Sequence, residues 1–222
     1  MQSARCLTSA PGPPAATPVT TFLLIRHAQC DHVGRVIAGR ALDVHLNEAG
    51  RRQAAQIADL LDPFQLDAIA SSPLPRALET ATPLADRKKL PLQILDHLAE
   101  IDYGDWTGRT LQDLEPEPPW RRFNALRSMA RVSGGELMVE VQARAVASLE
   151  LLRTRYRNGR CVVVSHGDVI RGLVAHCSGI PLDLFQRLEI SPASVSVIVV
   201  EESWIGVRCV NLTAAGLGAL AS

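Results

Sequence analysis

Two short apolar runs, far apart in the chain, both lead into a histidine. Residues 22–25 are followed by Arg26 and His27, and residues 161–164 lead to His166. A brief apolar run with β-branched residues is typical of a buried parallel strand. In an open α/β sheet the ligand site lies in the crevice beyond the carboxyl ends of the strands. We therefore expect both histidines to project into one site.

Strand and helix patterns alternate along the rest of the chain. We expect strands at residues 22–25, 67–71, 92–95, 161–164, 195–200 and 205–210. We expect helices at residues 47–61, 73–87, 120–130, 136–156 and 168–177. This alternation predicts a three-layer α/β/α sandwich with a mostly parallel central sheet, closed by a terminal strand pair.

Local signals indicate where the helices begin. Asn47 is suited to cap the first helix. Ser72 is expected to cap the second helix, with Pro73 at its first position. Asp168 is expected to cap the last helix. The helix at 120–130 has few neighbours in sequence, and we interpret it as a lid.

Length and composition indicate one ordinary domain. With 222 residues and 47% hydrophobic side chains, residues 21–222 are expected to form a single α/β domain. Residues 1–20, rich in proline, alanine, serine and threonine, are expected to be a disordered leader without the apolar core of a signal peptide. Lys+Arg and Asp+Glu both total 23, so no overall field favours nucleic acid or a membrane surface.

The cysteines and the hydropathy pattern bear on the compartment. The five cysteines are scattered and odd in number, which argues against a disulfide framework or a zinc site. No apolar stretch approaches the roughly 18 residues of a membrane span. We expect a cytoplasmic protein without a metal or other cofactor. The sequence gives no indication of the oligomeric state.

Two segments carry cationic groups suited to an oxyanion. A neutral His27 imidazole can act as a nucleophile, and the adjacent Arg26 offers planar, bidentate recognition of phosphate. Arg76 lies in the first turn of a helix, where a bound anion would offset its unfavourable interaction with the helix dipole. The structural alternatives are an ordinary strand-end dipeptide and a solvated surface arginine.

Two further segments supply an acid and a second imidazole. Glu100 opens a loop with glycine and tryptophan, and a carboxyl group there can protonate a departing ester oxygen. Asp102 and Asp105 compete for this role. His166, followed by Gly167 at a helix start, can stabilise the charge of a phosphoryl transition state. The alternatives are solvated loop carboxylates and a histidine with a structural role only.

These four segments together resemble one known family. The set LLIRHA, SSPLPRALETA, LAEIDYGDWTG and VVVSHG, in this order, is similar to the histidine phosphatase superfamily, also called phosphoglycerate mutase-like, over residues 21–210. The resemblance implies that His27 becomes phosphorylated, that Glu100 protonates the leaving oxygen and activates water, and that no metal is needed. It also implies that Arg26, Arg76 and His166 hold the phosphoryl group, and we expect Gly167 to be a further substrate-binding residue.

The chain departs from the family pattern after the first histidine. Ala28 stands where glycine is usual, and Gln29, Cys30 and Val33 replace an acidic residue, a hydroxyl residue and asparagine. The lost contacts bear on substrate affinity more than on the reaction. Arg35 and Arg40 are candidates to compensate by binding substrate.

Other mechanisms and functions remain to be weighed. A cysteine-dependent phosphatase needs C-x5-R, but Cys30 and Arg35 are spaced C-x4-R, and no HExxH pair indicates a metallohydrolase. Mutases of the family that the chain resembles carry a longer insertion between the acid and the second histidine, so the resemblance, with a short stretch between Glu100 and His166, implies hydrolysis rather than a mutase reaction. We therefore expect a phosphomonoester phosphatase acting on a small phosphorylated substrate. The alternatives are a weak phospholigand-binding or regulatory protein and a mutase-type phosphotransferase.

Overall fold

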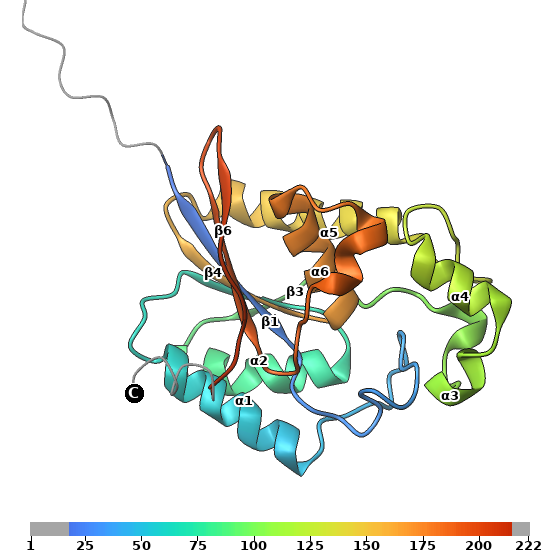
Figure 1. The fold of residues 1–222 in the computed structure, drawn as a ribbon. Coiled ribbons are helices and arrows are strands. Elements are labelled where there is room, and N and C mark those ends of the chain that lie inside the picture. Colours follow the sequence, from blue (N-terminus) through green and yellow to red (C-terminus); the bar gives the residue numbers. More distant parts are fainter. Residues whose placement is uncertain (1–17, 215–222) are drawn as a thin grey trace, which may run out of the picture.

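The computed structural model describes residues 18–214, and its arrangement is shown in Figure 1. The strands are β1 (Thr20–Arg26), β2 (Ala68–Ser71), β3 (Leu92–Ile94), β4 (Arg160–Ser165), β5 (Val195–Val200) and β6 (Ile205–Leu212). The α-helices are α1 (Glu48–Leu61), α2 (Pro75–Lys88), α3 (Leu111–Leu114), α4 (Pro118–Ala125), α5 (Met138–Arg155) and α6 (Gly167–Ser178). Short 3-10 helices cover Asp96–Leu98, Gly104–Trp106 and Leu182–Arg187.

The strands form one mostly parallel sheet in the order β3-β2-β4-β1-β5-β6. The first four strands of that order run parallel, while β5 pairs antiparallel with β1 and β6 pairs antiparallel with β5. Arg26, the last residue of β1, lies opposite Ser165, the last residue of β4. The residues that follow these two strands therefore emerge side by side at the carboxyl edge of the sheet.

Helices cover both faces of this sheet, which confirms the predicted three-layer sandwich. Figure 1 shows α1 and α2 on one face and α5 and α6 on the other. Successive side chains of a strand point to opposite faces. Leu23 and Ile25 accordingly pack with Ile57 of α1, whereas Phe22 and Leu24 pack in the core that contains Leu149 of α5. Both faces of the sheet are therefore covered by apolar side chains.

The predicted lid differs from the segment observed. Helix α4 spans Pro118–Ala125 rather than 120–130, and the chain leaves the helix at Leu126. Phe123 is fully buried and makes edge contacts with Tyr103 and Trp106. The segment is therefore anchored in the core by one aromatic side chain, while its neighbour Trp120 lines the cavity described below.

Two predicted helix caps are wrong and one is confirmed. Asn47 caps α1, because its side chain accepts a hydrogen bond from Gly50 N at 2.9 Å. Helix α2 begins at Pro75 with Leu74 as its N-cap, rather than at Pro73. The Ser72 hydroxyl instead forms a hydrogen bond with His166. The N-cap of α6 is His166. Asp168 lies inside the first turn of the helix, where Arg127 and Arg171 bind its carboxylate.

The remaining boundaries need smaller corrections. Helix α5 begins at Met138, two residues later than predicted, with Leu137 as its N-cap. Residues 1–17 of the predicted leader lie outside the described residues, as do 215–222, but Thr20 already belongs to β1. The single domain over 21–222 therefore stays a prediction. Of the helices described, none is long and apolar enough to cross a membrane.

Candidate active site

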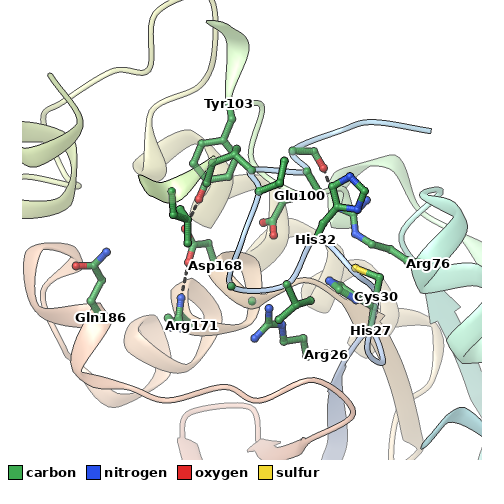
Figure 2. A pocket seen from close by; sticks show the side chains of 18 of the residues that line it. Arg26, His27, Cys30, His32, Arg76, Glu100, Tyr103, Asp168, Arg171 and Gln186 are labelled. Carbon is green, nitrogen blue, oxygen red and sulfur yellow. Dashed lines mark hydrogen bonds and ion pairs between the residues drawn. The ribbon is translucent and has the colours of Figure 1, made fainter. Parts of the chain in front are cut away.

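A cavity of about 400 Å³ opens at the carboxyl edge of the sheet. Its lining includes the residues after β1, the start of α2, the loop after β3 and the start of α6. Of the catalytic and substrate-binding residues predicted from the sequence, five line it: Arg26, His27, Arg76, Glu100 and Gly167. Figure 2 shows most of them from close by. Segments distant in sequence therefore meet around one space.

His27 is held as a neutral imidazole with a defined tautomer. Its main-chain N donates to Ser165 O at 2.8 Å, which ties the end of β1 to β4. Its ring Nδ1 lies 2.8 Å from Ala28 O. Because a carbonyl oxygen only accepts, Nδ1 must carry the proton, and Nε2 keeps its lone pair. Burial, together with the charges of Arg76 and Arg26, lowers the pKa of His27 well below its ordinary value.

His166 lies against His27 but is fully buried. The two ring centroids are 5.2 Å apart, and the rings are inclined by 56°. Nε2 of His166 is hydrogen-bonded to Ser72 Oγ at 2.7 Å, while Nδ1 is buried without a partner. Burial, with Arg76 next, lowers the pKa of His166 well below its ordinary value. If Ser72 donates to Nε2, the single ring proton lies on Nδ1, free for a ligand.

Arg26 and Arg76 present unused donors to the same space. Arg26 Nη1 donates to Ile190 O at 2.7 Å, and Arg76 Nη2 donates to Gly39 O at 2.7 Å. Arg26 Nε and both Nε and Nη1 of Arg76 are buried without a partner. A buried, unsatisfied polar group is costly and uncommon in a native fold. Buried cationic donors of this kind, without a partner in the protein, are suited to bind an oxyanion.

The close approach of Arg26 depends on Gly167. A Cβ at position 167 would lie 3.3 Å from Arg26 Nε. Gly167 also begins helix α6, whose first N–H groups have no partner within the helix. The helix start therefore adds positive potential where the guanidinium lies.

Glu100 has the electrostatics of a proton donor. Burial and the nearby charge of Asp168 raise its pKa to about 7, against the opposing effect of Arg76. Its Oε1 accepts from Ile101 N at 3.1 Å. The competing carboxylates Asp102 and Asp105 do not line the cavity within the described part of the chain. The structure thus favours Glu100 among the three.

The backbone of Glu100 is clamped by arginines that the sequence did not identify for this role. Arg144 of α5 donates to Ala99 O at 2.6 Å and to Glu100 O at 3.1 Å, and Arg40 Nε donates to Glu100 O at 3.0 Å. Glu136 accepts from both arginines and from Asp102 N. An acid whose main chain is fixed on several sides keeps its carboxyl group in place.

The two compensating arginines predicted from the sequence do not face the cavity. Of the described residues that line it, neither Arg35 nor Arg40 is one. Arg35 is exposed, and Arg40 bonds Glu136 and the main chain of Glu100. Spacing along the sequence could not reveal these placements.

Asp168 gathers three partners at the edge of the site. Its Oδ2 accepts from Tyr103 Oη at 2.7 Å and from Arg127 Nη1 at 2.7 Å, and its Oδ1 accepts from Arg171 Nη1 at 2.6 Å. The pKa of Asp168 is lowered by Arg127 and Arg171 despite its burial. The acid loop, the segment after α4 and helix α6 are therefore joined through one carboxylate.

The residues that depart from the family pattern line the cavity or support it. Cys30 and Val33 both face the space, and Cys30 is almost fully buried. Ala28 is buried, and its N donates to Thr80 Oγ1 at 2.9 Å, which in turn donates to Arg76 O. Ala28 is thus accommodated, and Thr80 links the main chain of Ala28 to that of Arg76. Within residues 18–214, no group of three or more His, Cys, Asp or Glu is placed to hold a metal ion.

Comparison with known proteins gives this geometry a context. Residues 22–213 match the family model of the histidine phosphatase superfamily, branch 1. Phosphoserine phosphatase 1 of Hydrogenobacter thermophilus is 34% identical over 196 residues, covering 86% of this chain and 92% of that protein. Glucosyl-3-phosphoglycerate phosphatase of Mycolicibacterium vanbaalenii is 35% identical over 175 residues, covering 74% of this chain and 77% of that protein.

Solved structures show the same fold. A mycobacterial glucosyl-3-phosphoglycerate phosphatase superposes with a TM-score of 0.78 at 28% identity, over 88% of this chain and 100% of that chain. A Bacillus stearothermophilus protein, YhfR, superposes with a TM-score of 0.82 at 29% identity, over 88% of this chain and 98% of that chain. The sheet-edge cavity is therefore found in a fold shared with known phosphatases.

Proposed function

We propose that this chain, which belongs to the histidine phosphatase superfamily and is a phosphomonoester phosphatase, works through a covalent phosphohistidine on His27. The observation that carries the proposal is the tautomer of His27: Nδ1 donates to Ala28 O, so the Nε2 lone pair is free to attack phosphorus. A depressed pKa keeps that lone pair available at neutral pH.

The phosphoryl group is held by donors that are otherwise unpaired. Arg26 Nε, Arg76 Nε and Nη1, and His166 Nδ1 are all buried without a partner, and a tetrahedral oxyanion satisfies them together. Such fixed donors stabilise the charge on the equatorial oxygens of a phosphoryl transition state. His27 is then the nucleophile, and Arg26, Arg76 and His166 bind the phosphoryl group.

Glu100 transfers the proton in both steps. In the first, the His27 Nε2–P bond forms, the ester P–O bond breaks, and the leaving oxygen takes the proton of Glu100. In the second, the Glu100 carboxylate accepts a proton from water as its oxygen attacks phosphorus and the N–P bond breaks. A pKa of about 7 suits both roles, because each protonation state is populated near neutrality.

The substrate is a small phosphorylated compound. A cavity of about 400 Å³ admits a phosphate with a modest leaving group, and the named relatives are phosphatases of phosphoserine and glucosyl-3-phosphoglycerate. The raised pKa of Glu100, which suits proton transfer, favours catalysis over simple binding of a phospholigand. We further expect no nucleic-acid partner. Four free cysteines among the described residues fit a reducing compartment such as the cytoplasm.

Replacing the nucleophile tests the proposal. His27→Ala is expected to abolish phosphate release from small phosphomonoesters while the circular dichroism spectrum and melting behaviour stay near those of the parent protein. Turnover retained by a pure, folded His27→Ala protein would overturn the assignment. His45→Ala is the matched control, since His45 is exposed and pairs with Glu79.

A further inference from the structure

The catalytic residues occupy only one side of the cavity. Beyond Glu100 the space is lined by a second polar group, composed of Trp120, Asn124, Arg127, Arg171 and Gln186. Figure 2 shows Arg171 and Gln186 on the opposite side of Glu100 from His27 and Arg76. This second set of side chains is therefore within the same cavity as His27 but on the far side of Glu100.

The Arg171 guanidinium is held in place in this part of the cavity, and its Nη2 has no hydrogen-bond partner among the described residues. Its Nη1 donates to Asp168 Oδ1 at 2.6 Å, and its Nε donates to Leu188 O at 2.9 Å. Among the described residues none accepts a hydrogen bond from its Nη2, and the side chain is 24% exposed where it lines the cavity. A guanidinium that is already oriented loses little entropy when it binds a planar anion.

Arg127 has less to offer a ligand, because both of its terminal nitrogens are paired and the one nitrogen without a partner, Nε, is buried. Its Nη1 donates to Asp168 Oδ2 and its Nη2 donates to Asn124 Oδ1, both at 2.7 Å, and the side chain is only 4% exposed. It also lies 4.0 Å over the ring of Phe123. Asp168 thus shares its one negative charge between two arginines, Arg127 and Arg171, and the pair keeps a net positive charge.

The charges that line the whole cavity also leave a net positive charge. Four of the described lining residues are arginines, against the carboxyl groups of Glu100 and Asp168. With Glu100 protonated for the first step, the arginines exceed the single ionised carboxylate by about three charges. A phosphomonoester dianion supplies about two of these negative charges. One positive charge stays unmatched, and of the two arginines beside Asp168, Arg171 is the more exposed and the one with a free terminal nitrogen.

We propose that Arg171 binds a carboxylate on the leaving group, so that the preferred substrates are phosphorylated hydroxy acids rather than phosphorylated neutral alcohols. This inference rests on the proposed function, because it places phosphorus at His27. It assigns a second anion subsite, distinct from the donors that hold the phosphoryl group. The fixed edge of Arg171 offers the carboxylate a charge-assisted hydrogen bond.

Matched substrates separate the carboxylate from the rest of the molecule. 3-Phosphoglycerate and glycerol 3-phosphate differ by a carboxylate in place of a hydroxymethyl group, and phosphoserine and phosphoethanolamine differ by a carboxylate in place of hydrogen. We would measure kcat/KM for both pairs with the parent protein, Arg171→Gln and Arg171→Lys. Arg187→Gln is the control, because Arg187 is exposed and follows Gln186 in the same segment.

The parent protein is expected to prefer the acidic member of each pair by about 10- to 100-fold, the range of a hydrogen bond to a charged group. Arg171→Gln reduces this ratio to near one, Arg171→Lys keeps part of it, and Arg187→Gln keeps all of it. Using a ratio within each variant cancels any general loss of activity caused by disturbing Asp168.

Two results would overturn the inference. One is a parent protein that does not prefer the acidic member of either pair, and the other is an Arg171→Gln protein that keeps the full preference. Phosphohistidine detected on His27 with p-nitrophenyl phosphate in the same preparations would show that the proposed function stands even so. Absence of phosphohistidine with every substrate would instead indicate failure of the proposed function itself.

Discussion

His166 Nε2 lies 2.7 Å from Ser72 Oγ, and this hydrogen bond fixes the second imidazole of the site from a different strand end. Ser72 follows β2, while His166 follows β4, and these strands are parallel neighbours in the sheet. The bond accounts for the tautomer that we assign, with a free N–H on Nδ1. It also explains why Ser72 does not cap helix α2.

Removing this hydroxyl tests its positioning role. Ser72→Ala should lower kcat by about tenfold, because His166 then loses the group that orients its ring and selects its proton position, a difference of about 1.4 kcal/mol. Ser72→Thr, which keeps the hydroxyl, should recover part of the rate. Equal rates for Ser72→Ala and the parent protein in single-turnover kinetics would show that the hydrogen bond does not matter for catalysis.

Loss of the Arg76 side chain is expected to reduce kcat/KM strongly. Arg76→Ala removes two of the buried, unpaired donors and should reduce kcat/KM by about 10²- to 10³-fold. Arg76→Lys restores the charge but not the planar pair of N–H groups, so it should recover only part of the loss. Arg87→Ala, at the exposed end of the same helix, is the control and should leave the kinetics unchanged. A fully active Arg76→Ala protein would contradict the assignment.

The pKa shifts of the site predict the shape of the pH profile. His27 must be neutral to attack, and its lowered pKa moves the acidic limb of kcat/KM well below pH 6.5. Glu100 must be protonated to release an alkoxide, so activity on alkyl phosphates should fall above its pKa of about 7. The profile from pH 4 to 9 should therefore peak on the acidic side of neutrality.

Replacing Glu100 tests whether this residue causes the fall in activity on the basic side of the pH profile. Glu100→Gln should lower the rate on alkyl phosphates by about 10²- to 10⁴-fold and remove the basic limb. The loss should be smaller with p-nitrophenyl phosphate, whose leaving group needs little protonation. Asp105→Asn, in the same loop but outside the cavity lining, should keep the limb. A basic limb that survives in Glu100→Gln would mean that another group is the acid.

Asp168 should be important for stability as well as for the site. Asp168→Asn leaves the buried guanidinium of Arg127 without its charged partner, and breaking a buried pair in this way costs about 3–5 kcal/mol in free energy of unfolding. Tyr103→Phe removes one hydrogen bond to the same carboxylate and should cost about 1 kcal/mol. Urea denaturation at pH 7 measures both. Similar, small losses for the two variants would show that Asp168 is not the central partner.

The fold was predictable because its signals are local. Apolar runs, helix periodicity and their alternation are properties of short windows, and they identified the parallel sheet and its two helical layers. The juxtaposition of His27 and His166 followed from the same reasoning, since parallel strands end at the same edge of a sheet. Glu100 was selected by its resemblance to a family motif, and its burial supports that choice.

The supporting contacts were not predictable in the same way. Arg40, expected to bind substrate, instead bonds Glu136 and the backbone of Glu100, and Asp168, expected to cap a helix, binds Arg127 and Arg171. These partners lie far apart in the sequence. Which acceptor an arginine meets depends on how the loops pack in three dimensions, and no spacing rule along one chain encodes it.

The most direct test of the account is a search for phosphate on His27 during turnover. The parent protein, mixed with a good substrate and quenched within milliseconds in alkaline denaturant, should yield a phosphorylated peptide containing His27 in mass spectrometry. The phosphate should disappear from His27 once the substrate is exhausted, and Glu100→Gln should accumulate phosphorylated His27 with p-nitrophenyl phosphate. Steady turnover without phosphate on His27 at any time point, or phosphate on His166 instead, would contradict the account.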